Sequence, residues 1–168
     1  MDLYLDDEID EGADPLDLVE AVVGSDDRFS VERCDDGDVQ FSLTRAWPEA
    51  AGHISYRGEL PALLFTMGFD MRAPKSRRDE ASKLAALINE NLWLGHFDVW
   101  SDDGSIIFRH SLPMIGRDEI SPGEIQALLA AALDAAERFH PAFQFLLQAG
   151  TTPEEAAQAA MFETAGEA

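Results

Sequence analysis

The segment Asn89–Leu112, NENLWLGHFDVWSDDGSIIFRHSL, decides the fold because it contains the end of a helix, two strands and the turn between them. Gly95 is placed to end an amphipathic helix, since glycine readily adopts the left-handed conformation that follows a helix. Asp102-Asp103-Gly104 is typical of a hairpin turn, which needs the same conformation. The segment therefore predicts two antiparallel strands, at 97–100 and 105–112.

The clearest alternation in the sequence precedes this segment. Residues 62–72 alternate between the two faces of a predicted strand. Its odd positions are predicted to face the core: Leu63, Phe65, Met67, Phe69 and Met71. Next, Ser76 and Asp79 have the spacing of a capping box, which predicts a helix that runs to about Leu94. The apolar stripe of this helix consists of Ala81, Leu84, Leu87, Ile88 and Leu92.

A first helix and three more strands are predicted nearer the N-terminus. Asp14 is a typical N-cap, Pro15 suits the first helical position, and Gly24 suits the end of the helix. The strands are predicted at 29–34, 39–45 and 53–56, with a turn region at 48–52.

Two helices are predicted in the C-terminal part of the chain. Ser121 and Glu124 form a second capping-box pattern, and Pro141 is expected to kink or split the helix that follows. Thr152 opens a last short helix that reaches about Phe162. Helices combined with antiparallel strands indicate an α+β fold, one antiparallel sheet with the helices packed on one face.

We expect a single domain at 14–162, flanked by an acidic, mobile tail at 1–13 and a short tail at 163–168. The chain has 168 residues, of which 46% are apolar, so it can bury a substantial core. Twelve basic and 33 acidic residues give a net charge of −21, which would repel nucleic acid and anionic membrane surfaces. Neither is expected as a partner.

A cytoplasmic location is expected from the composition. Cys34 is the single cysteine, so no intrachain disulfide and no thiolate zinc cluster can form. The N-terminal sequence lacks the features of a secretory signal, and no apolar run is long enough to span a bilayer.

No residue pattern predicts a catalytic, metal or cofactor site. The four histidines lack the spacing of a metal pair, the acidic N-terminal residues do not fit a calcium loop, and no phosphate-binding glycine motif occurs. We therefore expect a protein without cofactors that is not an enzyme. The alternative is a small-molecule sensor or an enzyme with a pocket near His96 and His110, which lie on the two arms of the predicted hairpin.

Two groups of residues are candidates for binding a partner. A basic cluster consists of Arg72, Lys75, Arg77, Arg78 and Lys83. Neighbouring acids could neutralise it, or it could bind an acidic segment, such as the chain's own residues 1–12. Trp93 and Trp100 are the second group, because tryptophan is enriched where proteins bind one another, although core packing is the simpler explanation for most of the aromatic residues.

The sequence also resembles the YbjN family of small bacterial proteins. The resemblance is carried by the opening segment, by Phe69-Asp70-Met71-Arg72 and by Arg138-Phe139-His140-Pro141-Ala142-Phe143, with the run PEEAAQAAMFETAGEA after them. It implies a fold like that of type III secretion chaperones, a role as a sensory transduction regulator or chaperone-like adaptor, and a homodimer. It implies no catalytic residues.

Overall fold

The computed structural model describes residues 14–44, 48–59, 61–117 and 119–165. Within them the chain forms four α-helices, a short 3-10 helix and six strands. In chain order these are α1 Pro15–Gly24, β1 Phe29–Arg33, β2 Val39–Leu43, β3 Ala50–Arg57, β4 Ala62–Arg72, η1 Lys75–Arg77, α2 Arg78–Asn89, β5 His96–Val99, β6 Ser105–Pro113, α3 Pro122–Ala149 and α4 Pro153–Ala165.

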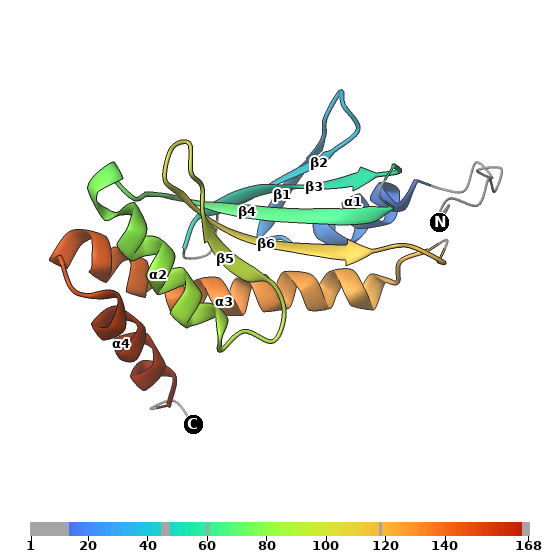
Figure 1. Cartoon of the computed structure of the whole chain (residues 1–168). Coiled ribbons are helices and arrows are strands. Elements are labelled where there is room, and N and C mark those ends of the chain that lie inside the picture. Colours follow the sequence, from blue (N-terminus) through green and yellow to red (C-terminus); the bar gives the residue numbers. More distant parts are fainter. Residues whose placement is uncertain (1–13, 45–47, 60, 118, 166–168) are drawn as a thin grey trace, which may run out of the picture.

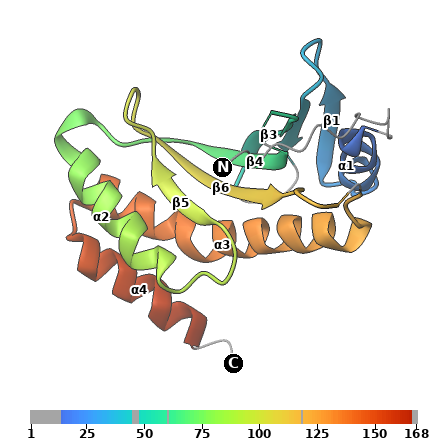
Figure 2. The ribbon, with the colours of Figure 1, turned by 45° about the vertical axis from the view of Figure 1, so that its right-hand side comes forward.

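The strands form one antiparallel sheet in the order β1-β2-β3-β4-β6-β5. Helix α3 runs along one face of this sheet, with α1 near one end of it and α2 and α4 near the other (Figures 1 and 2). The predicted α+β architecture, a sheet with helices on one face, is confirmed.

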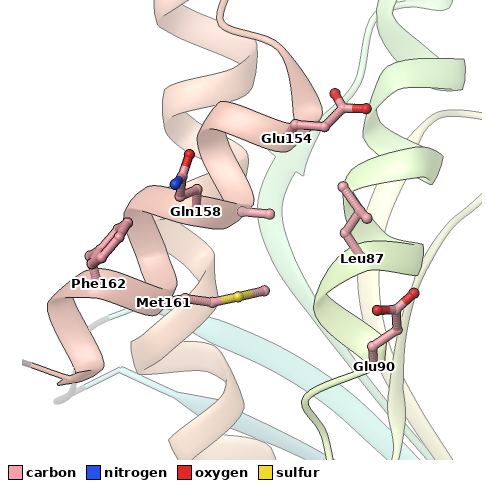
Figure 3. A pocket seen from close by; sticks show the side chains of 7 residues that line it. Leu87, Glu90, Glu154, Gln158, Met161 and Phe162 are labelled. Atoms are coloured by element: carbon pink, nitrogen blue, oxygen red, sulfur yellow. The ribbon is translucent and has the colours of Figure 1, made fainter.

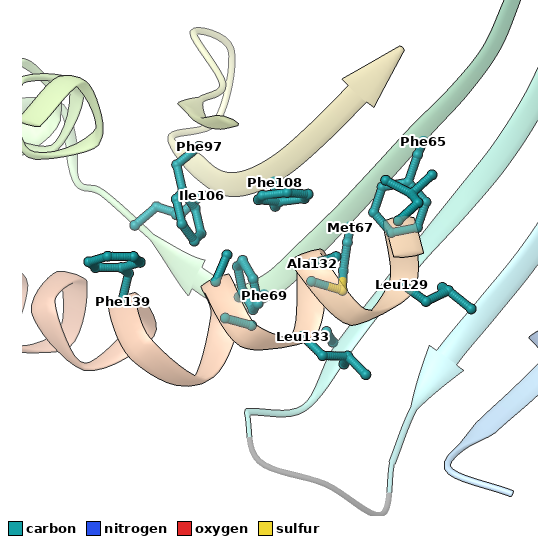
Figure 4. Packing of buried hydrophobic residues seen from close by; sticks show 14 of the residues in the cluster. Phe65, Met67, Phe69, Phe97, Ile106, Phe108, Leu129, Ala132, Leu133 and Phe139 are labelled. Carbon is teal, nitrogen blue, oxygen red and sulfur yellow. The ribbon is translucent and has the colours of Figure 1, made fainter. Parts of the chain in front are cut away.

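The core lies between the sheet and α3 (Figure 4). Of the five odd positions predicted to face it from β4, four are buried and Met71 is half-buried. The ring of Phe108 on β6 lies 6.3 Å from that of Phe65 and 5.6 Å from that of Phe97, both in edge-to-face geometry. The Phe97 ring also meets Phe139 of α3 at 6.3 Å, so the hairpin is joined to the helix layer through aromatic contacts.

The predicted hairpin is confirmed, with Phe97 opposite Phe108 and Asp98 opposite Ile107. Gly104 has φ +79° in the turn, as the pattern required. Gly95 also has a positive φ, +72°, but it does not cap the helix, because α2 already ends at Asn89. A Cβ on Gly95 would lie 2.2 Å from the Phe108 ring, so glycine is needed there for space as well as for conformation.

The turn predicted at 48–52 is wrong, because β3 begins at Ala50. Ala50 and Ala51 already pair with Phe69 and Gly68 of β4. Gly52 is part of the strand, and a Cβ there would lie 2.1 Å from the Thr66 carbonyl oxygen. Close approach of the neighbouring strand, rather than a turn, explains this glycine.

The capping box predicted at Ser76 is also wrong. Residues Lys75–Arg77 form a 3-10 turn, α2 begins at Arg78, and its N-cap residue Arg77 makes no side-chain capping bond. The equivalent pattern at Ser121 is confirmed, since Ser121 and Glu124 bond one another's backbone N–H groups. Helix α3 continues through Pro141 without splitting and ends at Gly150, whose φ is +69°.

Candidate functional site

In the structure, two residues of the basic cluster make contacts within the fold, and the other three lie at the surface. Arg77 is turned toward the C-terminal end of α3. Its Nη2 donates to the Leu146 carbonyl at 2.9 Å and to the Thr151 carbonyl at 3.0 Å, and its Nε lies 2.6 Å from a Glu80 carboxylate oxygen. The last carbonyls of a helix have no partner within the helix. Arg77 therefore stabilises the junction between α3 and α4.

Arg78 is bound to the hairpin turn. Its Nη1 donates to the Ser101 carbonyl at 2.7 Å, and its Nη2 and Nε donate more weakly to the Asp102 and Ala73 carbonyls, both at 3.4 Å. The guanidinium thus joins the start of α2 to the β5–β6 turn. Together with Arg77, it explains why these cations stand at a helix N-terminus that does not favour them.

The other three basic residues remain at the surface. Arg72 lies 3.6 Å from Asp103, and Lys83 forms an ion pair with Glu154 of α4, whose pKa is lowered by the hydrogen bond from Lys83. Lys75 is exposed on η1. One of the two alternatives for the cluster was neutralisation by acids that are close in the sequence, which are Asp70, Asp79 and Glu80. Of these, Glu80 pairs with Arg77, while Asp103 and Glu154 are distant in the sequence. The proposed acidic partner at 1–12 lies outside the described residues.

Both candidate tryptophans are exposed. Trp93, in the turn after α2, is 76% exposed, and Trp100, at the end of β5, is 46% exposed. They are accordingly not explained by core packing. Trp47 lies outside the described residues.

An apolar groove between α2 and α4 was not predicted. The two helices run side by side in the same direction (Figures 1 and 2), and a cavity of about 490 Å³ opens between them. Leu87 and Met161 point into this space (Figure 3). The α2–α4 groove is lined by Leu87, Glu90, Glu154, Ala157, Gln158, Met161 and Phe162.

Phe162 is 68% exposed at the far end of this groove. Phe162 lies near the C-terminal end of α4, and Trp93 lies in the turn that follows the C-terminal end of α2. The sequence did contain a signal, since Met161-Phe162 are large apolar residues in a helix that otherwise buries alanines.

The edge of β5 is closed by a side chain. The side-chain oxygen of Asn89 accepts a hydrogen bond from the Phe97 N–H at 2.8 Å, and its side-chain nitrogen donates one to the Phe97 carbonyl at 3.0 Å. The Val99 N–H is bonded to the Asp98 carboxylate at 2.9 Å. Asn89 thus takes the place of a neighbouring strand, and a partner cannot extend the sheet here without displacing it.

His96 and His110 do not share a pocket. His96 pairs with Arg109, the residue next to His110, and successive side chains of a strand point to opposite faces. Burial lowers the pKa of His110, and the charge of His96 acts in the same direction. The pairing therefore places the two imidazoles on opposite faces of the sheet, which does not support a common site for them.

Cys34 is poorly suited to act as a nucleophile. Partial burial raises the pKa of its thiol, and the nearby carboxylates of Asp36, Glu32, Asp38 and Asp35 raise it further. A raised pKa leaves little thiolate at neutral pH. In the described part of the chain, no three His, Cys, Asp or Glu side chains gather in a way that could hold a metal ion. In the same part, no helix combines the length and the apolar character that crossing a membrane requires.

Comparison with known proteins identifies the family. The model of the YbjN family, described as "putative bacterial sensory transduction regulator", matches residues 15–145. This range covers helix α1, the whole sheet and most of α3. No curated protein matches the sequence. Since the match covers more than half of the chain, the protein belongs to the YbjN family.

Proposed function

We propose that this protein is a non-enzymatic protein-binding module that acts as a sensory transduction regulator or chaperone-like adaptor. The observations that carry the proposal are the apolar α2–α4 groove, which the exposed Phe162 lines, and the exposed side chain of Trp93 in the turn after α2. Large aromatic side chains at a groove are typical of binding hot spots. The family description, which names a regulator, supports the same class of function.

The proposed binding surface differs from the one that the sequence suggested. Arg77 and Arg78 are used in packing, so of the basic cluster we retain only Arg72, Lys75 and Lys83 as secondary contacts. Trp93 is retained at the main surface. Trp100 stands at the opposite end of β5 and is a second, separate candidate. We further propose that the protein acts in the cytoplasm as a homodimer, as the family resemblance implies.

Affinity capture from the native organism tests the proposal. The bait is the full chain, compared with a Trp93→Ala/Phe162→Ala double variant and with Ile115→Ala, an exposed apolar residue (78% exposed) in the loop after β6. A protein that is recovered with the wild type and with Ile115→Ala, but lost with the double variant, supports the proposal. Equal recovery on all three baits contradicts it.

A further inference from the structure

We propose that the α2–α4 groove binds a cationic amphipathic helix of a partner protein, with the apolar face of that helix against Leu87, Met161 and Phe162. This inference rests on the proposed function and names the chemistry of the partner. Three observations support it: the parallel arrangement of α2 and α4, the apolar floor between them, and the distribution of charge around them.

The parallel helices provide the shape. A third helix can lie along the groove between two neighbouring helices, at the usual axis separation of about 8–10 Å. The groove extends from Glu154, in the first turn of α4, to Phe162, more than two turns further along. A binding helix of several turns therefore has a continuous surface to contact.

The floor of the groove requires apolar side chains in the partner. Leu87 and Met161 are only partly buried in the free protein, and Phe162 is largely exposed. Methionine adapts its shape to different neighbours, which suits a surface that receives a side chain from another molecule. An amphipathic helix offers such side chains at i, i+3 or i+4, and i+7.

The charge around the groove favours a cationic partner. Glu90 and Glu154 line the groove; the ion pair with Lys83 offsets the charge of Glu154, and Glu90 adds a further negative charge. The sequence has no Lys or Arg between Arg138 and Ala168, and Glu154 and Glu155 both lie in the first turn of α4. Lys and Arg flanking the apolar face of the partner would meet these acidic side chains.

Charge disfavours a second copy of the chain as the occupant, and the closed edge of β5 disfavours a strand-adding peptide. A second copy of the chain would bring another net charge of −21 to these acidic side chains. The sheet edge that lies beside α2 is that of β5, and there Asn89 already bonds both backbone groups of Phe97, which disfavours an extended peptide. A helix needs no backbone hydrogen bonds from the sheet edge or from α2 and α4, because it binds through its side chains.

The test uses designed helical peptides and the full-length protein. The probe is a fluorescent amphipathic peptide of about 18 residues, five turns, built from Leu and Lys. A Leu/Glu peptide of the same pattern and a Leu/Lys peptide of the same composition in scrambled order serve as controls. Binding is measured by fluorescence anisotropy at low and at moderate salt.

Matched variants separate groove binding from general attraction to an acidic protein. Phe162→Ala is paired with Ile115→Ala, and Glu90→Lys with Glu32→Lys, an exposed acid on β1 that changes the net charge equally. We expect the two groove variants to weaken binding about fivefold or more and the two controls to leave it unchanged. The effect of Glu90→Lys should shrink with added salt, and that of Phe162→Ala should persist.

The inference is overturned if all four variants bind the Leu/Lys peptide equally, if the scrambled or Leu/Glu peptide binds as well, or if Phe162→Ala turns a dimer into a monomer in light scattering. The last result would make the groove a contact between copies. The cationic-helix proposal can fail while the proposed protein-binding function still holds. A captured partner that needs Trp93 and Phe162 but binds through a neutral or acidic segment would contradict only the cationic helix.

Discussion

Arg77 donates hydrogen bonds to carbonyls that lie 69 and 74 residues further along the chain. Its position next to Arg78 and near Lys75 suggested a binding surface, because the sequence shows only that the cations are close together. Whether a guanidinium faces solvent or the end of another helix depends on where that helix packs. The residue therefore acts in the fold, and its contribution can be measured as stability.

Replacing Arg77 by alanine is predicted to destabilise the protein by about 1–3 kcal/mol, because the Leu146 and Thr151 carbonyls would lose a charged donor at a partly buried site. Chemical denaturation with urea measures the change. Lys75→Ala removes the same charge from an exposed position and should change the urea concentration at the unfolding midpoint very little. Equal effects of the two substitutions would show that charge alone, and not the bonds to α3, is responsible.

At the scale of elements, local signals predicted most of the secondary structure, and tertiary contacts explain the errors. The alternation in β4 and the capping box at Ser121 are local and were predicted correctly. Ser76 has the same kind of spacing, but it lies in a 3-10 turn whose next residue, Arg77, bonds the Leu146 carbonyl of α3, a contact that the local sequence does not reveal. Gly52 looked like part of a turn because nothing local reveals the approach of β4.

The candidate site was predicted only in part for the same reason. Trp93 could be chosen from its residue type alone. The α2–α4 groove could not, because it exists only where α4 folds back beside α2.

The N-terminus of α3 predicts a specific dependence on pH. The Arg117 guanidinium lowers the pKa of Glu124 to about 2, and the Ser121 N–H contributes further. Since this pKa is below the ordinary value of 4.5, the contribution of Glu124 to stability is present above pH 4.5 and is lost as the pH falls toward 2. Glu124→Gln should therefore be less stable than the wild type at pH 7, and the difference should vanish near pH 2.

Denaturation curves recorded between pH 7 and pH 2 check this expectation. Glu49→Gln, at an exposed position before β3, is the matched control. A difference between Glu124→Gln and wild type that stayed constant across this range would exclude ionisation of Glu124 as the cause.

The closed edge of β5 carries a prediction about association. Asn89→Ala leaves the N–H and carbonyl of Phe97 without their partner, which should lower stability by about 1–3 kcal/mol and expose a strand edge that promotes association. Urea denaturation and light scattering over a range of concentrations measure the two effects. Asn91→Ala, which loses one exposed bond to the Leu87 carbonyl, is the control. If both variants associate equally, Asn89 does not protect the edge.

For the whole molecule, the charge of −21 and the exposed apolar surface have opposite effects on association. Charge opposes the association of copies, whereas the binding surface that we propose, Trp93, Phe162 and the α2–α4 groove, would favour contact with a partner of opposite charge. The homodimer that we propose must therefore use another surface and leave the groove free.

Light scattering at micromolar concentration should give a mass near twice 18.5 kDa, with the same mass for Phe162→Ala. A monomeric mass at high concentration would contradict the homodimer, and the proposed binding function would then apply to a monomer.

Photo-cross-linking from position 93 tests the central claim most directly. A benzoylphenylalanine replaces Trp93 in one protein and Ser111, an exposed residue of β6, in another, and both are irradiated in extracts of the native organism. The proposed function predicts that position 93 forms a discrete adduct with a protein partner and that position 111 does not. An adduct from position 111 alone, or none from either position, would contradict a binding surface at the C-terminal ends of α2 and α4.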